Sequence, residues 1–521
     1  MAYTLERVDH DVLLQIYDIL HLKRDLVPLS LTSKAIRASC IPVLFKNATV
    51  TSAYIASDQF IPRHLWPHVQ CLIFYGPWIE RHPTRVSRRE PLSLTEVFVH
   101  MPRLSRISIR NTQMYGVPWA SLSAILSHTG LRVLDVQDSL HHWDIEDMPL
   151  INFFISAPPL TTYRHFLPDY REHPRNLRGD LHPLACFASQ RQFQLSLETL
   201  VASSEVIPFA DLATADWPRL TVLHIQGELP RGTPPLVYAF GRMPRLRELH
   251  VNVACVPATG RTAICPPDWS GPAPWPELKS LVVSSPQPED PLYSHLPTGL
   301  RHLALRCWPH RYVYIESHER GTTTDLNWHH NILTASEMIQ ILSRCGLPDT
   351  EELELEFEVD ERDMEPLQLI SANFPTLVSL TVFRYRRPGH PHIPIQDIGK
   401  ALSPLVHLRN LYMHLDPTWQ PHPYAATNHG GQHEFRRFYE YLQEAAIILA
   451  RVLPLSATVI CLLERRKSQN LWRPFRIERA HDVHASLCLD IADNMNVKRE
   501  EEPGPPYHPP IRMGHYSDDT R

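Results

Sequence analysis

The stretch M-P-R-L-R-E-L-H-V (residues 243–251) decides the fold of this 521-residue chain. Its aliphatic residues follow the pattern L-x-x-L-x-L, and the last two are separated by the period of two that is typical of a β-strand. A large apolar residue and a proline precede the first leucine. Because proline has no N–H to donate, it is tolerated where a strand begins. The stretch therefore predicts a short strand with a characteristic lead-in.

The same lead-in occurs five times along the chain. Each copy places a large apolar residue before a proline, and the leucine two positions later starts the aliphatic pattern. Five copies of one tetrapeptide define the register of a repeat. The copies are Met101–Leu104, Trp217–Leu220, Met243–Leu246, Trp275–Leu278 and Phe374–Leu377.

The aliphatic pattern itself returns between about residues 65 and 415, most often at intervals of 20 to 40 residues. Such intervals hold a helix or loop that returns to start the next parallel strand, so the pattern predicts an α/β solenoid of parallel strands. The clear copies are Leu104/Ile107/Ile109, Leu131/Leu134/Val136, Leu220/Leu223/Ile225, Leu246/Leu249/Val251, Leu278/Leu281/Val283, Leu300/Leu303/Leu305, Leu377/Leu380/Val382 and Leu408/Leu411/Met413. The weaker copies are Val69/Leu72/Phe74, Leu160/Tyr163 and Leu353/Leu355.

The composition argues against several classes of function. The chain has 49 Pro but only 18 Gly, which argues against the glycine-rich loops of many enzymes. It lacks G-x-G-x-x-G, Walker-type and G-x-S-x-G motifs, so we expect no enzymatic activity and no cofactor. A net charge of −5 does not favour nucleic-acid binding. The nine Cys include no C-x-x-C pair, which indicates reduced and mostly buried thiols. Without a secretory signal or a membrane-spanning segment, the sequence predicts a soluble protein of the cytoplasm or nucleus, or both.

The first fifty residues predict three short helices. Asp9 is expected to cap a helix that ends near His21, while Asp25 and Ser33 are expected to cap the next two. Ile41-Pro42 is expected to end the third helix. Three such helices cannot bury all their apolar side chains alone. We therefore expect a partner chain or the next domain to cover them.

Three segments of this region resemble an F-box of the form common in fungi: V-D-H-D-V-L-L-Q-I-Y-D-I-L (8–20), D-L-V-P-L-S-L-T-S-K-A-I-R (25–37) and I-P-V-L-F-K-N (41–47). The resemblance implies docking onto the Skp-type adaptor of an SCF-type cullin–RING ubiquitin ligase. The usual initial Leu-Pro is here Val8-Asp9. A small helical cap that seals the next domain is the alternative. The positions that match the apolar contacts of the family are Val8, Val12, Leu13, Ile16, Leu20, Leu26 and Leu29.

The long middle region is similar to leucine-rich repeats. An F-box followed by such repeats implies a substrate-recognition subunit, which holds a protein substrate near the ubiquitin-conjugating machinery and performs no catalysis itself. A leucine-rich-repeat scaffold without ligase coupling is the alternative. The Asn or Cys that usually follows each strand is absent, so we expect an irregular solenoid in an open arc with long connections. The equivalent positions hold Thr112, Ser139, Glu228, Ala254 and Pro286.

The predicted domains are an F-box (1–50), an irregular leucine-rich-repeat array (51–420), a C-terminal helix with closing strands (421–496) and a disordered tail (497–521). Pro-rich stretches at 254–276 and 286–297 predict exposed loops. Helices are predicted at 92–100, 119–128, 335–345, 395–402 and 434–453, and closing strands at 458–463, 475–477 and 486–489.

Candidate substrate-binding residues follow from the resemblance, because residues between and after the aliphatics of each strand face the concave side of such an array. They carry acids, amides and imidazoles without a dominant charge, so they do not name a ligand, and a solvated surface is equally consistent. Glu354 and Glu356 are expected on the solvent face of a strand, where they could form an acidic docking strip. The candidates are Asp135, His224, Gln226, His250, Asn252, Arg306, Glu354, Glu356, Tyr412 and His414.

The 31 His raise the question of a metal site. The pairs His141-His142, His329-His330 and His390-x-His392 offer imidazoles, but none has a Cys or carboxylate partner at a motif spacing. The sequence therefore predicts no metal site.

Overall fold

A computed structural model describes the chain in two compact units, residues 1–223 and 224–521. Each unit is considered by itself. The division falls inside the repeat region. The described residues are 8–22, 25–51, 60–76, 94–112, 116–137, 158–167, 184–256, 260–312, 328–387, 392–422, 429–466 and 469–478.

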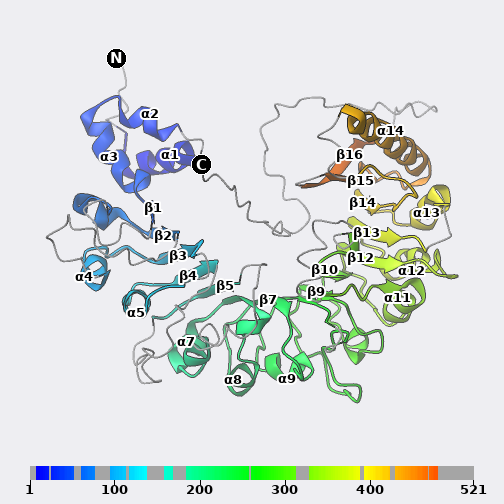
Figure 1. Ribbon diagram of the computed structural model, residues 1–521, viewed down its shortest axis with the longest axis horizontal. Coiled ribbons are helices and arrows are strands. Elements are labelled where there is room, and N and C mark those ends of the chain that lie inside the picture. The colour runs from blue at the N-terminus through cyan, green and yellow to red at the C-terminus, as the bar shows by residue number, and fades with distance from the viewer. Residues whose placement is uncertain are drawn as a thin grey trace. The chain divides into compact units, whose positions relative to one another are not determined.

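The first unit begins with three helices and continues with parallel strands separated by short helices (Figure 1). Its elements are α1 (His10–Leu22), α2 (Leu26–Ser30), α3 (Lys34–Leu44), β1 (Asn47–Thr51), η3 (Arg63–His68), β2 (Cys71–Tyr75), α4 (Leu94–Val99), β3 (Arg106–Arg110), α5 (Trp119–Leu126), β4 (Val133–Gln137), β5 (Thr162–Phe166), α7 (Arg191–Ser196), β6 (Thr199–Ser203), η7 (Ser204–Val206) and α8 (Phe209–Thr214).

The second unit contains almost all of β7 and the rest of the repeats. Its elements are β7 (Val222–Glu228), α9 (Leu236–Phe240), β8 (Glu248–Ala254), β9 (Ser280–Ser284), η8 (Pro291–Ser294), β10 (His302–Arg306), β11 (Leu333–Thr334), α11 (Ala335–Leu342), β12 (Glu352–Glu358), α12 (Glu365–Asn373), β13 (Ser379–Tyr385), α13 (Ile395–Leu402), β14 (Asn410–His414), α14 (His429–Val452), β15 (Val459–Arg466) and β16 (Gln469–Arg476).

Within each unit the strands pair in chain order and in parallel, which confirms the predicted repeat. The exceptions are β11, which pairs with β12 outside this order, and β16, which forms an antiparallel hairpin with β15. The second aliphatic of each copy faces its equivalent on the next strand, as in Leu281↔Leu303↔Leu353. These residues are buried, so one continuous row of side chains forms the core of each unit.

The five lead-in tetrapeptides each form a tight turn. The leucine N–H donates to the carbonyl oxygen of the large apolar residue three positions earlier, at 3.0–3.4 Å. Proline occupies the second position of the turn, where its fixed φ is favourable. The large apolar residues, such as Trp217 and Trp275, are fully buried, and the indole of Trp275 donates to the carbonyl oxygen of Phe240 at 3.0 Å. The prolines therefore set the position at which each strand begins.

Five helices between strands lie where the sequence predicts them, while α7, α8, α9 and α12 are not among its predictions. The predictions for 92–100, 119–128, 335–345 and 395–402 correspond to α4, α5, α11 and α13, and that for 434–453 corresponds to α14, which begins earlier. In Figure 1 the helices α11 to α14 stand side by side on one face of the sheet. Gly399 allows close packing there, because a Cβ at this position would lie 2.2 Å from a methyl carbon of Val452 on α14.

The three N-terminal helices are confirmed, with two differences at their ends. Ser33 caps α3 by accepting the N–H of Ile36 at 3.1 Å, as predicted. Asp25 stands at the cap of α2, but its side chain accepts no capping hydrogen bond. Pro42 does not end α3, which continues to Leu44. Only one backbone hydrogen bond is lost to Pro42, and burial of Val43 stabilises the last turn.

Three strands and two loops differ from the predictions. The sequence does not predict β1, which has no leucine, β6, whose pattern ends in Ala202, or the two-residue strand β11. The stretches 254–276 and 286–297 are not simply exposed. The buried Asp290 carboxylate accepts N–H groups of Ile264, Cys265 and Leu292, and these bonds tie the two loops together.

Several predictions fall on residues outside the described ranges. These are the strand at 486–489, the tail at 497–521, Ser139 and the pair His141-His142. Of the eight described cysteines, all are free and seven are buried, as predicted. Among the described helices, none combines the length and the apolar character that a membrane span requires.

Removing a core side chain should destabilise the repeats strongly. Leu303 is fully buried and pairs with a leucine on each neighbouring strand, so Leu303→Ala should lower the free energy of unfolding by about 2–5 kcal/mol in urea denaturation. Val406→Ala, at an exposed position, should change it by less than about 0.5 kcal/mol. Equal effects of the two variants would contradict the assigned core.

Candidate functional site

The polar face of the second unit is the side of its strands opposite to the buried aliphatics. Side chains alternate between the two faces of a strand, so residues between the core positions collect there. All the candidate substrate-binding residues except Asp135 belong to this face, on β7, β8, β10, β12 and β14. Asp135 lies on β4 in the first unit, where it accepts a hydrogen bond from Ser108 at 3.3 Å and is 3.8 Å from the guanidinium of Arg110.

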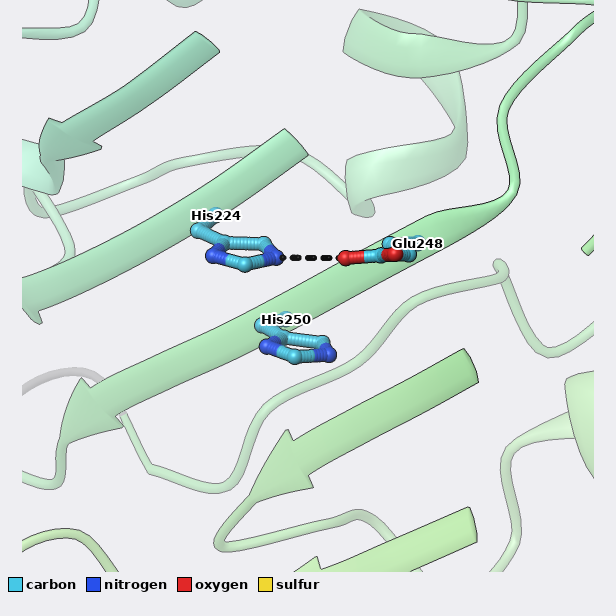
Figure 2. A group of neighbouring side chains, drawn as sticks. All are labelled: His224, Glu248 and His250. Carbon is cyan, nitrogen blue, oxygen red and sulfur yellow. Dashed lines mark ion pairs between the residues drawn. The ribbon is translucent and has the colours of Figure 1, made fainter. Parts of the chain in front are cut away.

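A histidine cluster occupies one part of the polar face. His224 and His250 stack with ring centroids 3.9 Å apart and an interplanar angle of 5°. His224 Nε2 is 3.4 Å from Glu248 Oε2 (Figure 2), and this contact lowers the pKa of the Glu248 carboxyl. His250 Nε2 lies 3.0 Å from Ser280 Oγ, which in turn lies 2.7 Å from His302 Nδ1. Four neighbouring strands, β7 to β10, thus supply three imidazoles and the hydroxyl that links two of them.

Arg306 is the centre of a second group. Its guanidinium is buried and donates to both oxygens of Glu354, at 3.0 and 3.2 Å. It also donates to Asn252 Oδ1 at 2.8 Å. Three predicted candidates therefore meet, but they are engaged with one another. Both contacts with Glu354 come from one nitrogen, Nη1, while Nη2 donates to Asn252, so the buried pair holds these side chains in place and leaves little net charge.

Glu356 is the most enclosed of the candidates, with 1% of its surface exposed. Its carboxylate accepts hydrogen bonds from the backbone N–H groups of Cys307 and Arg311 at 2.9 Å, and from Tyr385 Oη at 2.9 Å. His310 Nδ1 lies 2.7 Å away. These four contacts satisfy the carboxylate where water cannot reach it.

The predicted solvent exposure of Glu354 and Glu356 is therefore wrong, and so is an acidic docking strip formed by them. The segment that follows β10 supplies Cys307, His310 and Arg311, which cover this part of β12. The alternating pattern correctly places both glutamates opposite the core. It does not reveal that another segment covers that side.

Aromatic rings form the remainder of the polar face. Tyr412 meets Trp472 edge-to-face, with ring centroids 5.4 Å apart. His414 is buried beside Tyr385 at 5.0 Å, and neither of its ring nitrogens has a hydrogen-bond partner among the described residues. Burial, together with the nearby charge of Arg465, lowers the pKa of His414 to about 3. His414 is therefore neutral and inaccessible rather than a surface contact.

Sequence reasoning missed Glu248, His302 and His310. Glu248 and His302 directly precede the second aliphatic of their repeats, so the period of two places them on the polar face. The candidate set covered only residues between and after the aliphatics, which explains the omission. His310 lies in an irregular connection, and no periodic signal identifies it.

Some of the predicted adaptor-binding residues are buried in the core of the three N-terminal helices, and others are exposed on their surface. Leu13 and Leu26 are buried in the packing of α1, α2 and α3, so their side chains do not form a contact surface. Val8, Leu20 and Leu29 are partly buried against that core. On α1, Ile16 is half-buried and Val12 is exposed. Three further exposed apolar residues were missed, namely Ile19, Val27 and Leu31.

No protein-family model and no curated protein matches the sequence. Among solved structures, the TLR13–ssRNA13 complex is similar at 13% identity, over 70% of this chain and 46% of that one, with a TM-score of 0.26. This chain therefore spans about half the length of the TLR13 chain.

Two further solved structures are similar at a comparable level. The leucine-rich-repeat-containing protein LegL7 from Legionella pneumophila is 12% identical, over 80% of this chain and 91% of that one, with a TM-score of 0.21. The mouse RP105/MD-1 complex is 12% identical, over 74% and 72%, with a TM-score of 0.29. The register of the chain's own strands, rather than these overlaps, defines the leucine-rich-repeat type of fold.

Neutralising the ionised group at Glu356 should destabilise the second unit. Glu356→Gln replaces an acceptor by an amide that faces N–H and O–H donors, so we expect a loss of about 3–5 kcal/mol in the free energy of urea unfolding. Glu277→Gln, whose partner Arg247 is exposed, should cost at most about 1 kcal/mol. A similar small loss at both positions would show that the buried contacts of Glu356 are not formed.

His414 should make the protein sensitive to acid. Its folded pKa lies below the ordinary value of 6.5, so the unfolded chain binds the proton first and stability falls as the pH drops below 6.5. Between pH 7.5 and 5.5 this group should account for about 1.4 kcal/mol, measured by urea unfolding at each pH. His414→Phe should remove that part of the pH dependence, while His407→Gln, at an exposed position, should leave it unchanged.

Proposed function

We propose that this protein is a non-catalytic, substrate-recognition subunit of an SCF-type cullin–RING ubiquitin ligase, working in the cytoplasm or nucleus, or both. In this function the N-terminal helices bind the Skp-type adaptor, which links the protein to the cullin. The repeats hold a protein substrate. Catalysis by proximity needs only that the substrate be held near the reacting groups.

The observation that carries the proposal is an apolar stripe on α1 that the rest of the described chain leaves uncovered. Val12, Ile16 and Ile19 follow one another at i, i+4 and i+7, so they lie on one side of the helix. Val12 is 46% exposed and Ile19 is 56% exposed. On an adjacent side of the helix, about 100° away, Leu13 and Tyr17 pack into the helical core.

The second helix and its C-cap carry two further exposed apolar residues. Val27 is 57% exposed and Leu31 is 72% exposed. Full burial of one such side chain contributes about 1.5–3 kcal/mol, so four of them give a partner a considerable driving force. Exposed apolar groups gathered on one small domain are typical of a protein-binding site. The resemblance of residues 8–47 to an F-box is the reason for proposing the Skp-type adaptor as this partner.

The polar face supports the second half of the proposal. Two of its charged residues, Arg306 and Glu354, are buried and paired with each other, so they add no strong charge to the surface that a partner would meet. Tyr412 and Trp472 add half-buried aromatic surface, a residue type enriched in protein interfaces. A folded protein or a peptide fits such a surface better than a polyanion.

A leucine-rich-repeat scaffold without ligase coupling is the second candidate. The observation that favours it is Val8-Asp9 in place of the usual Leu-Pro at the start of the box. Here Asp9 begins α1 by accepting the N–H of Asp11 at 2.9 Å. This cap gives the helix a defined start without proline, so the substitution is compatible with either function.

Co-purification with the Skp-type adaptor tests the proposal. The full chain should form a stoichiometric complex, and the double variant Val12→Asp, Ile19→Asp should weaken it at least tenfold, because each charge would be buried at the contact. Both positions are exposed in the free protein, so the variant should fold. Val406→Asp, an exposed apolar position in the second unit, is the matched control and should bind as the parent does.

The outcomes separate the two candidates. If the parent chain forms no complex with the adaptor, ligase coupling is wrong and the scaffold function remains. If the parent and the double variant bind equally well, the adaptor contacts a different face of the helices.

A further inference from the structure

The histidine cluster has a geometry that the ligase function does not require. His224 and His250 each follow the second aliphatic of adjacent copies, Leu223 and Leu249. Neighbouring strands bring these equivalent positions together, which explains the nearly parallel rings 3.9 Å apart. Glu248 lies two residues before His250, so it shares the same face of β8. Three potential ligands therefore come from two adjacent strands.

The three side chains point toward a common region. In Figure 2 both imidazoles present a nitrogen on the side where the Glu248 carboxylate lies. One ligand atom from each of the three residues falls within 4.8 Å of the other two. From this arrangement we infer that His224, Glu248 and His250 form a binding site for a divalent first-row transition-metal ion, with Zn²⁺ as the simplest occupant.

The distances suit such an ion. Ligand bonds of about 2.0–2.1 Å in a tetrahedral complex place the donor atoms about 3.3 Å apart. The separation of 3.4 Å between His224 Nε2 and Glu248 Oε2 agrees with that spacing. The stacked His250 must turn about its Cβ–Cγ bond so that its lone pair meets the same point. The site is thus formed except for one side-chain rotation.

The ligand types also match. Two neutral imidazoles and one carboxylate are borderline donors that bind Zn²⁺, Co²⁺ or Ni²⁺ better than Mg²⁺ or Ca²⁺. The carboxylate offsets one of the two positive charges of the ion. Three protein ligands leave one position of a tetrahedral ion for water or for a side chain of a bound partner.

The surroundings allow entrance and hold the ligands in place. The His224 and Glu248 side chains keep 29% and 46% of their surface exposed, so an ion can reach them from solvent. Ser280 and His302, on the next two strands, form a hydrogen-bonded chain to His250. This chain holds the His250 ring in its present orientation through Nε2, and an ion that binds this nitrogen takes the place of the Ser280 hydroxyl there.

None of the His pairs considered in the sequence contributes to this site. His141-His142 and His390 lie outside the described residues, while His329 and His330 belong to the connection before β11. The prediction that the chain has no metal site rested on spacing along the sequence. Here the first two ligands are 24 residues apart, and strand pairing joins them.

Calorimetric titration of the full chain with Zn²⁺ tests the inference. The parent should bind one equivalent that both His250→Gln and Glu248→Gln lose or bind at least tenfold more weakly. His407→Gln removes an exposed imidazole elsewhere in the second unit and is the matched control, so it should bind Zn²⁺ as the parent does. This comparison separates the site from weak binding to the many other histidines.

A second measurement guards against misfolded variants. Zn²⁺ should raise the thermal unfolding midpoint of the parent and of the control, since an ion that binds only the folded state stabilises it, and should raise those of the two site variants much less. Co²⁺ should give the visible absorption of a four-coordinate ion in the parent and in the control, and not in the two site variants. Equal Zn²⁺ binding by all four proteins, or no saturable binding by the parent, would overturn the inference. Neither result depends on whether the adaptor binds.

Discussion

In-register pairing of parallel strands is the constraint on which the rest of the structure depends. Because equivalent residues of successive repeats face one another, one aliphatic position generates a continuous buried row, as Leu281, Leu303 and Leu353 do. The same pairing places equivalent polar positions side by side on the opposite face. The same pairing of strands therefore forms both the buried core on one face of the sheet and the candidate binding surface on the other.

In-register pairing also brings charged residues on the polar face close together. Such residues can be buried only where hydrogen bonds satisfy them. Glu354 and Glu356 lie on one strand and would repel each other if left unpaired. Arg306 neutralises the first, and backbone N–H groups with Tyr385 satisfy the second. The sequence predicts Glu354 and Glu356 to be binding residues. In the structure they hold the segment that follows β10 against the sheet.

In the N-terminal helices, by contrast, no other described segment covers all of the apolar side chains. The three helices bury Leu13, Tyr17 and Leu26 among themselves but leave Val12 and Ile19 exposed. A small group of helices has a large surface for its volume, so some of its apolar side chains remain exposed to solvent unless a partner covers them. This shortage of covering structure, rather than any single side chain, leaves apolar groups on the surface of the helices.

The sequence by itself determined the repeat, its register, the turns of the lead-in tetrapeptides and most of the helices. These features follow from local periodicity and from proline geometry, which act over a few residues. Only the tertiary structure decided which polar residues stay accessible. Glu356 is covered by a distant segment, while Glu248 meets His224 across a strand boundary. Such contacts join residues far apart in the chain, and no local pattern encodes the distance between them.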